Sequence, residues 1–124
     1  MGGAKGYTRI VSTCDGGSKF EDAELQLTEQ QVAAGVPPMF VGGLSSSAGV
    51  VFLCSAAFDS DPHPAPGKQW VVMLRGAIEV EVSDGTRRRF GPGDLVLVTD
   101  TTGSGHVTVA MGDPPLEALF VPQA

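Results

Sequence analysis

Alternation of apolar and polar residues recurs through the second half of the chain and predicts short β-strands. Residues 78–83 read Ile-Glu-Val-Glu-Val-Ser, with an apolar side chain at every second position, which is the pattern of a strand with one buried face. Residues 69–75 and 95–98 are apolar runs of strand length. The turn signals Asp84-Gly85 and Gly91-Pro92-Gly93 separate these runs. We therefore expect paired hairpins here, with further strands at residues 87–90, 106–111 and 116–121.

The first half of the chain has weaker periodicity. Residues 1–19 contain several glycines, and we expect an extended N-terminal arm with one short strand at 8–12. Residues 20–27 alternate as a half-buried strand does. Residues 28–34 could form one helical turn, which Pro37-Pro38 would stop. We expect short strands within 39–42 and 50–58, a proline-rich loop at 59–67, no sustained helix, and a barrel spanning 20–124.

The composition supports an all-β chain with one domain. Hydrophobic residues make up 42% of the 124 residues, so a core is affordable, and 17 glycines and nine prolines indicate many turns. The formal net charge of −6 disfavours nucleic acid and anionic membranes as partners. We expect a cytoplasmic protein, since no signal-type apolar segment follows the N-terminus. Cys54 lies in an apolar run, so we expect its thiol to be buried. Strands, turns and glycines together predict a sandwich or a barrel of the jelly-roll type.

The chemistry is expected to gather around His63 and His106, the two histidines of the chain. An imidazole can bind a metal or move a proton near neutral pH. His63 lies in the proline-rich loop before the predicted strand at 69–75, and His106 begins a later strand. Each could instead be a loop-fixing group with no chemical role.

These two histidines stand at motif positions of a known superfamily. His63, Gln69 and Gly76 follow one another as in a first motif, with six residues between Gln69 and Gly76. Gly93 and His106 follow one another as in a second motif. This pattern resembles the cupin superfamily, and in particular a variety of small bacterial cupins. Ala65 stands where a second histidine is usual, and His106 comes two residues late. The resemblance implies a cupin-type jelly-roll β-barrel.

The resemblance implies a metal site formed by three histidines and one glutamate, which this chain retains in part. His63, Gln69 and His106 would be the ligands of a divalent iron, manganese, nickel or zinc ion, and Asp61 or Asp100 could supply a replacement oxygen. Because the glutamate and one histidine of this set are missing, we expect no bound cofactor and a metal-independent isomerase, cyclase or dehydratase. His63 would be its base, His106 the partner or acid, and Gln69 would bond a carbonyl. A non-catalytic module that binds a small molecule is a third hypothesis, beside a metal-dependent dioxygenase or lyase.

Two further residues are candidates for contact with a small-molecule substrate. They are Trp70, which follows Gln69, and Asp100, in the loop before His106. Strand alternation turns Trp70 away from Gln69. Trp70 therefore has core or interface packing as its competing role. Small cupins are commonly dimers, and the exposed edge of a jelly roll needs cover, so we expect a homodimer.

Overall fold

The computed structural model describes residues 3–46 and 49–123, and every regular element in this part of the chain is a β-strand. The strands are β1 Ala4–Ser12, β2 Ser18–Gln26, β3 Thr28–Gln30, β4 Met39–Val41, β5 Val51–Ser55, β6 Phe58–Asp59, β7 Gln69–Arg75, β8 Ile78–Glu81, β9 Arg87–Phe90, β10 Leu95–Val98, β11 Val107–Ala110 and β12 Leu116–Pro122. The predicted all-β class is confirmed. The strands after residue 69 lie where hydrophobic alternation and turn signals placed them.

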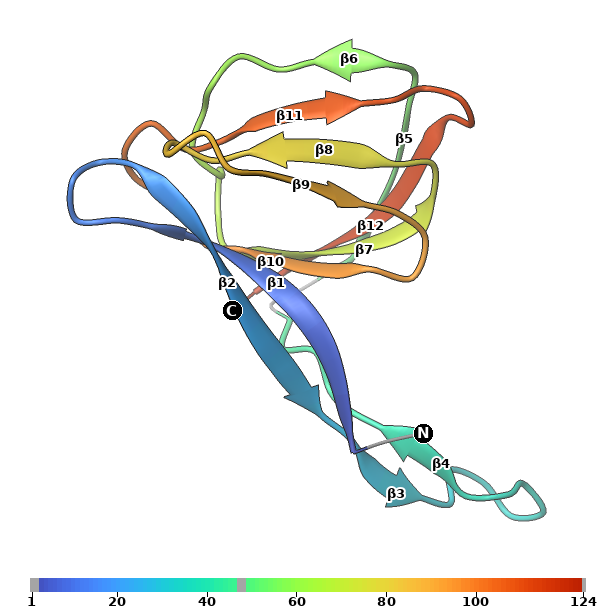
Figure 1. Cartoon of the computed structure of the whole chain (residues 1–124). Helices are drawn as coiled ribbons and strands as arrows, with labels where there is room; N and C mark the ends of the chain where they lie inside the picture. The colour runs from blue at the N-terminus through green and yellow to red at the C-terminus, as the bar shows by residue number, and fades with distance from the viewer. Residues whose placement is uncertain (1–2, 47–48, 124) are drawn as a thin grey trace.

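Strands β5 to β12 form a jelly roll. One sheet contains the neighbours β10-β7-β12-β5, and the facing sheet has the order β6-β11-β8-β9. Apart from the β8–β9 hairpin, consecutive strands from β5 to β12 alternate between the two sheets, as in a jelly roll. Figure 1 shows β6, β11, β8 and β9 of one sheet above β10, β7 and β12 of the other. The strand order itself confirms the predicted jelly-roll barrel.

The N-terminal hairpin extends the larger sheet. Strand β1 runs parallel to β10, with Thr8 opposite Val96 and Ile10 opposite Val98, and β2 pairs with β1 over the full length of both. The expected short strand at 8–12 is thus longer and begins at Ala4. Its first residues show no alternation because they are exposed and pair through the backbone with β2. Ile10 is 1% exposed, so this hairpin also contributes to the barrel core.

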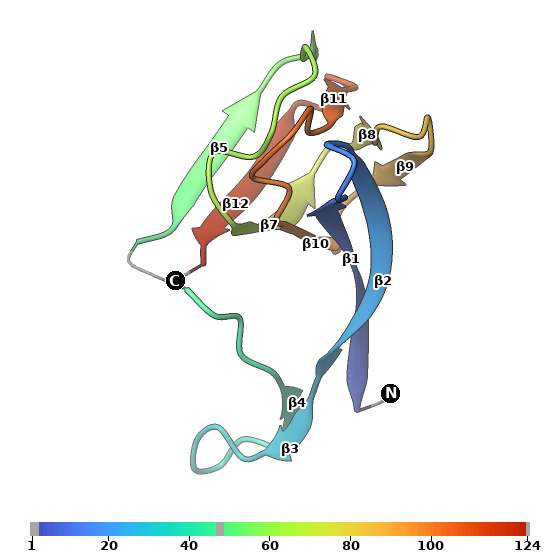
Figure 2. The ribbon, with the colours of Figure 1, turned by 90° about the vertical axis from the view of Figure 1, so that its left-hand side faces the viewer.

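A second hairpin leaves the barrel altogether. Strands β3 and β4 pair only with each other in the described sheets, as Thr28 opposite Val41 through Gln30 opposite Met39. Residues 28–30 are therefore extended, and the helical turn considered for 28–34 is not formed. Figure 2 shows this hairpin well away from the two sheets of the barrel.

Two apolar clusters lie on opposite faces of the larger sheet. Inside the barrel, residues such as Met73, Val80 and Val96 are almost fully buried. Outside it, Trp70 packs with Leu97 and Val121.

The expected burial of Cys54 is wrong. Both cysteines, Cys14 and Cys54, are free and exposed. Cys54 belongs to β5, which ends the sheet and has β12 as its one neighbour there, so an apolar run of sequence does not bury every side chain in it. Within the described residues, no helix has the length and hydropathy required to cross a membrane.

Candidate functional site

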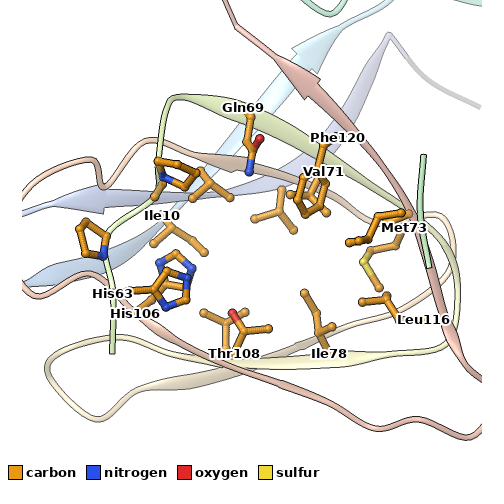
Figure 3. A pocket seen from close by; sticks show the side chains of 18 of the residues that line it. Ile10, His63, Gln69, Val71, Met73, Ile78, His106, Thr108, Leu116 and Phe120 are labelled. Atoms are coloured by element: carbon orange, nitrogen blue, oxygen red, sulfur yellow. The ribbon is translucent and has the colours of Figure 1, made fainter. Parts of the chain in front are cut away.

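A cavity of about 420 Å³ lies between the two sheets of the barrel. Its polar lining consists of His63, Gln69, His106 and Thr108, and the other lining side chains are apolar. Figure 3 shows both imidazoles at one end of the cavity, with Met73 and Leu116 at the other. The size falls within the range of small-molecule sites, which are usually apolar with a few placed polar groups.

The backbone brings the two histidines together. His63 and His106 form an isolated antiparallel bridge, in which each backbone N–H donates to the other residue's carbonyl at 3.1 and 3.0 Å. Residues paired in this way project their side chains to the same side, and the ring centroids are 5.2 Å apart. The two histidines expected to act together therefore lie side by side on two hydrogen-bonded chain segments.

Gly105 makes this approach possible. Its φ is +70°, and a Cβ built there would lie 1.9 Å from the backbone oxygen of His63. A side chain at this position would push the two segments apart, so glycine is needed on grounds of both backbone conformation and space.

A buried carboxylate orients the ring of His106. Asp100 is 0% exposed and His106 is 8% exposed, and Asp100 Oδ2 lies 2.6 Å from His106 Nδ1. The other oxygen, Asp100 Oδ1, has no hydrogen-bond partner among the described residues. A carboxylate accepts a hydrogen bond from Nδ1–H, which leaves Nε2 as the nitrogen that can take part in chemistry.

A backbone carbonyl fixes the tautomer of His63 in the same way. His63 Nδ1 lies 2.8 Å from the oxygen of Asp61, and a carbonyl can only accept, so Nδ1 carries the proton. His63 is exposed to solvent yet lines the cavity, so it lies at the opening, whereas His106 lies inside. In their neutral forms both rings therefore offer an acceptor nitrogen, Nε2.

Strand alternation in β7 divides the other candidates. Gln69, Val71 and Met73 occupy one face of β7 and line the cavity. Trp70 lies on the opposite face, where its ring meets Tyr7 edge-on with centroids 4.8 Å apart. Trp70 is therefore not among the cavity residues, and its expected contact with a substrate is corrected to packing outside the barrel.

Asp100 also does not line the cavity. It stands behind His106, and its backbone oxygen accepts from the N–H of Ala65 at 2.9 Å. The structure thus places Asp100 as a support of His106 and not in the substrate-contact position expected from the sequence.

Thr108 is the lining residue that sequence reasoning missed. It lies on β11, two positions after His106, so the alternation of an extended chain places both on the cavity side. That spacing was available in the sequence. The two additional residues before His106 do not carry its ring out of the barrel, because the loop turns at Gly103 and Gly105 with positive φ.

The donors at the site fit a divalent cation poorly. The described residues contain no group of three or more His, Cys, Asp or Glu side chains placed to hold a metal ion. A cation at the cavity would meet two imidazoles and the neutral amide of Gln69, while the carboxylate of Asp100 is hydrogen-bonded to His106. Fe, Mn, Ni and Zn sites normally include more ligands or a charged one, so these residues do not fit such an ion.

Comparison with known proteins finds structural likeness at low sequence identity. No protein-family model matches the chain, and no curated protein matches its sequence. Among solved structures, an ethanolamine utilization protein Q from Salmonella typhimurium LT2 superposes with a TM-score of 0.43 at 14% identity, over 98% of each chain. A likeness at this level carries no information about the activity of the present chain.

Proposed function

We propose that this barrel is a metal-independent enzyme that moves a proton on a small carbonyl compound, as an isomerase, cyclase or dehydratase does. The observation that carries the proposal is the buried Asp100–His106 pair beside a cavity of ligand size. A carboxylate that holds Nδ1–H fixes the tautomer of the ring and stabilises the imidazolium formed when Nε2 takes a proton.

The geometry favours His106 as the base, a role that the sequence assigned to His63. His106 Nε2 would remove a proton from the carbon next to a carbonyl group, leaving an enol or enolate. Gln69 can donate its amide N–H to the oxygen on which charge develops. The imidazolium of His106 formed in this step would then return the proton at a second position or to a departing hydroxyl group. His63, 5.2 Å from His106 between ring centroids, would accept a hydrogen bond from the substrate through Nε2.

Proton exchange tests this proposal before the natural substrate is known. The protein is incubated in D₂O with a panel of small ketones and β-dicarbonyl compounds, and NMR measures deuterium incorporation next to the carbonyl. We expect incorporation above the buffer rate, reduced about 100-fold or more in His106→Ala and unchanged in Arg87→Ala, a surface control. A chelator should leave the rate unchanged.

Ligand binding without exchange would contradict catalysis and support the alternative of a non-catalytic binding module. That alternative is favoured by the largely apolar lining of the cavity. Stoichiometric metal in protein purified without a His tag, with exchange lost on chelation, would instead support a metal-dependent dioxygenase or lyase.

We also propose that the protein is a homodimer in the cytoplasm. The edge strand β5 exposes Val51 and Phe52 at 53% and 58%, and the projecting hairpin exposes Met39 and Phe40 at 47% and 39%. A two-stranded hairpin is marginally stable by itself. The hairpin of one copy packing on the β5 edge of the other would cover both surfaces with twofold symmetry.

A further inference from the structure

We infer that the cavity selects an uncharged ligand with an enol or phenol hydroxyl at one end and an apolar body. This inference deepens the proposed function, because it names the class of molecule that would occupy the same site. It rests on three properties of the cavity, namely its charge, its hydrogen-bonding groups and the position of its polar end.

The charge of the lining excludes ionised ligands. None of the eight Lys and Arg residues of the chain is among the lining residues. With both imidazoles neutral, an anion would lose its hydration without gaining a counter-charge, and the buried carboxylate of Asp100 is hydrogen-bonded to His106. A cation would find no carboxylate in the lining either. The cavity therefore suits a neutral molecule.

The hydrogen-bonding groups specify a donor on the ligand. Nδ1 of His63 is satisfied by the oxygen of Asp61, and Nδ1 of His106 by Asp100. Both neutral rings then present Nε2 as an acceptor. A plain ketone offers only another acceptor to these nitrogens, whereas an enol or phenol hydroxyl donates to one of them. Gln69 can serve a neighbouring oxygen through its amide.

The shape of the cavity places the apolar part of the ligand. The imidazoles lie at one end, while Met73 and Leu116 lie at the other (Figure 3). At about 30 Å³ for each water-sized group, the 420 Å³ volume corresponds to about 14 such groups. A six-membered ring with a short alkyl chain fits within that limit, with the hydroxyl at the histidine end.

A matched set of three probes tests the inference by calorimetric titration near neutral pH. The probe para-propylphenol is a stable enol analogue, para-propylanisole lacks only the O–H donor, and para-propylbenzoate carries a negative charge. We expect the phenol to bind about tenfold more tightly than the anisole and the benzoate to give no measurable binding. Lengthening the alkyl chain from methyl to propyl should tighten phenol binding about fourfold per methylene.

Variants assign the effect to the site. His106→Leu should reduce the preference for phenol over anisole to about twofold or less, whereas Arg87→Ala should preserve it. Equal binding of phenol and anisole, tighter binding of the benzoate, or failure of the phenol to bind at millimolar concentration would each overturn the inference. These measurements require no turnover. Failure of the deuterium exchange with the phenol preference intact would therefore remove the catalytic proposal alone.

Discussion

At the scale of single residues, the orientation of one ring depends on Asp100. Replacing it with leucine, which has a similar branched shape, removes the acceptor at His106 Nδ1, so the ring should adopt the Nε2–H tautomer that a free histidine side chain prefers. Nitrogen-15 NMR of the imidazoles reports the tautomer directly. We expect Asp100→Leu to protonate Nε2 and to lower deuterium exchange about 100-fold.

The conservative variant separates orientation from packing. Asp100→Asn keeps a carbonyl oxygen that can accept from Nδ1–H, so it should retain the wild-type tautomer and recover part of the exchange rate. An Nδ1–H signal that persists in Asp100→Leu would show that the carboxylate does not set the tautomer.

Gly105 governs the site through the backbone. In Gly105→Ala the new methyl group would collide with the His63 carbonyl at a φ of +70°, and we expect a loss of roughly 3 kcal/mol or more in the free energy of unfolding. Gly85→Ala is the matched control, because φ there is +88° but nothing lies within 4 Å of the added atom. It should cost about 1 kcal/mol. Urea denaturation of both proteins measures the difference, and equal losses would contradict the proposed close approach.

At the scale of elements, the β8–β9 hairpin contains a titrating turn. The Thr86 side chain, followed by the Thr86 backbone N–H, which donates at 2.8 Å, lowers the pKa of Asp84 below 3.8. Because the folded-state pKa is depressed, the stabilisation is present above about pH 3.8 and is lost as the pH falls through the folded value. Carbon-13 NMR titration should find the Asp84 midpoint below 3.8 and moved upward in Thr86→Val. An unchanged midpoint would exclude a contribution from the hydroxyl.

The same hairpins show which parts of the fold can be predicted from the sequence. Strands β7 to β10 are bounded by turn residues, β8 alternates in hydrophobicity, and β7 and β10 are apolar runs, so local pattern predicts them. The parallel pairing of β1 with β10 is not local, since it joins Thr8 to Val96. This pairing is therefore hard to predict from the residue pattern of the glycine-containing arm. The projecting β3–β4 hairpin likewise has no core-facing pattern, because neither strand packs in the barrel sheets.

The candidate site could likewise be predicted only in part. His63 and Gln69 could be placed from motif order and strand alternation. The role of Asp100 could not, because its contact with His106 depends on how the loop between β10 and β11 closes. Thr108 could have been found, since it shares a strand face with His106.

At the scale of the whole molecule, the proposed dimer makes a direct prediction. Phe40→Ser on the hairpin and Phe52→Ser on β5 should each weaken self-association, because each removes an aromatic side chain from the proposed contact. Light scattering after size exclusion at micromolar concentration measures the effect. Met111→Ser, which alters an exposed apolar side chain elsewhere, is the control. A wild-type protein that runs only as a 12.8 kDa species would contradict the dimer.

The bridge between His63 and His106 also bears on how this barrel could acquire new chemistry. Main-chain hydrogen bonds hold the two positions at a fixed spacing whatever their side chains are. Mutation can therefore exchange the reactive groups one at a time while the framework that aligns them stays in place. A scaffold of this kind lends itself to divergence among descendants and to redesign in the laboratory, since a replacement at either position inherits a neighbour already within reach.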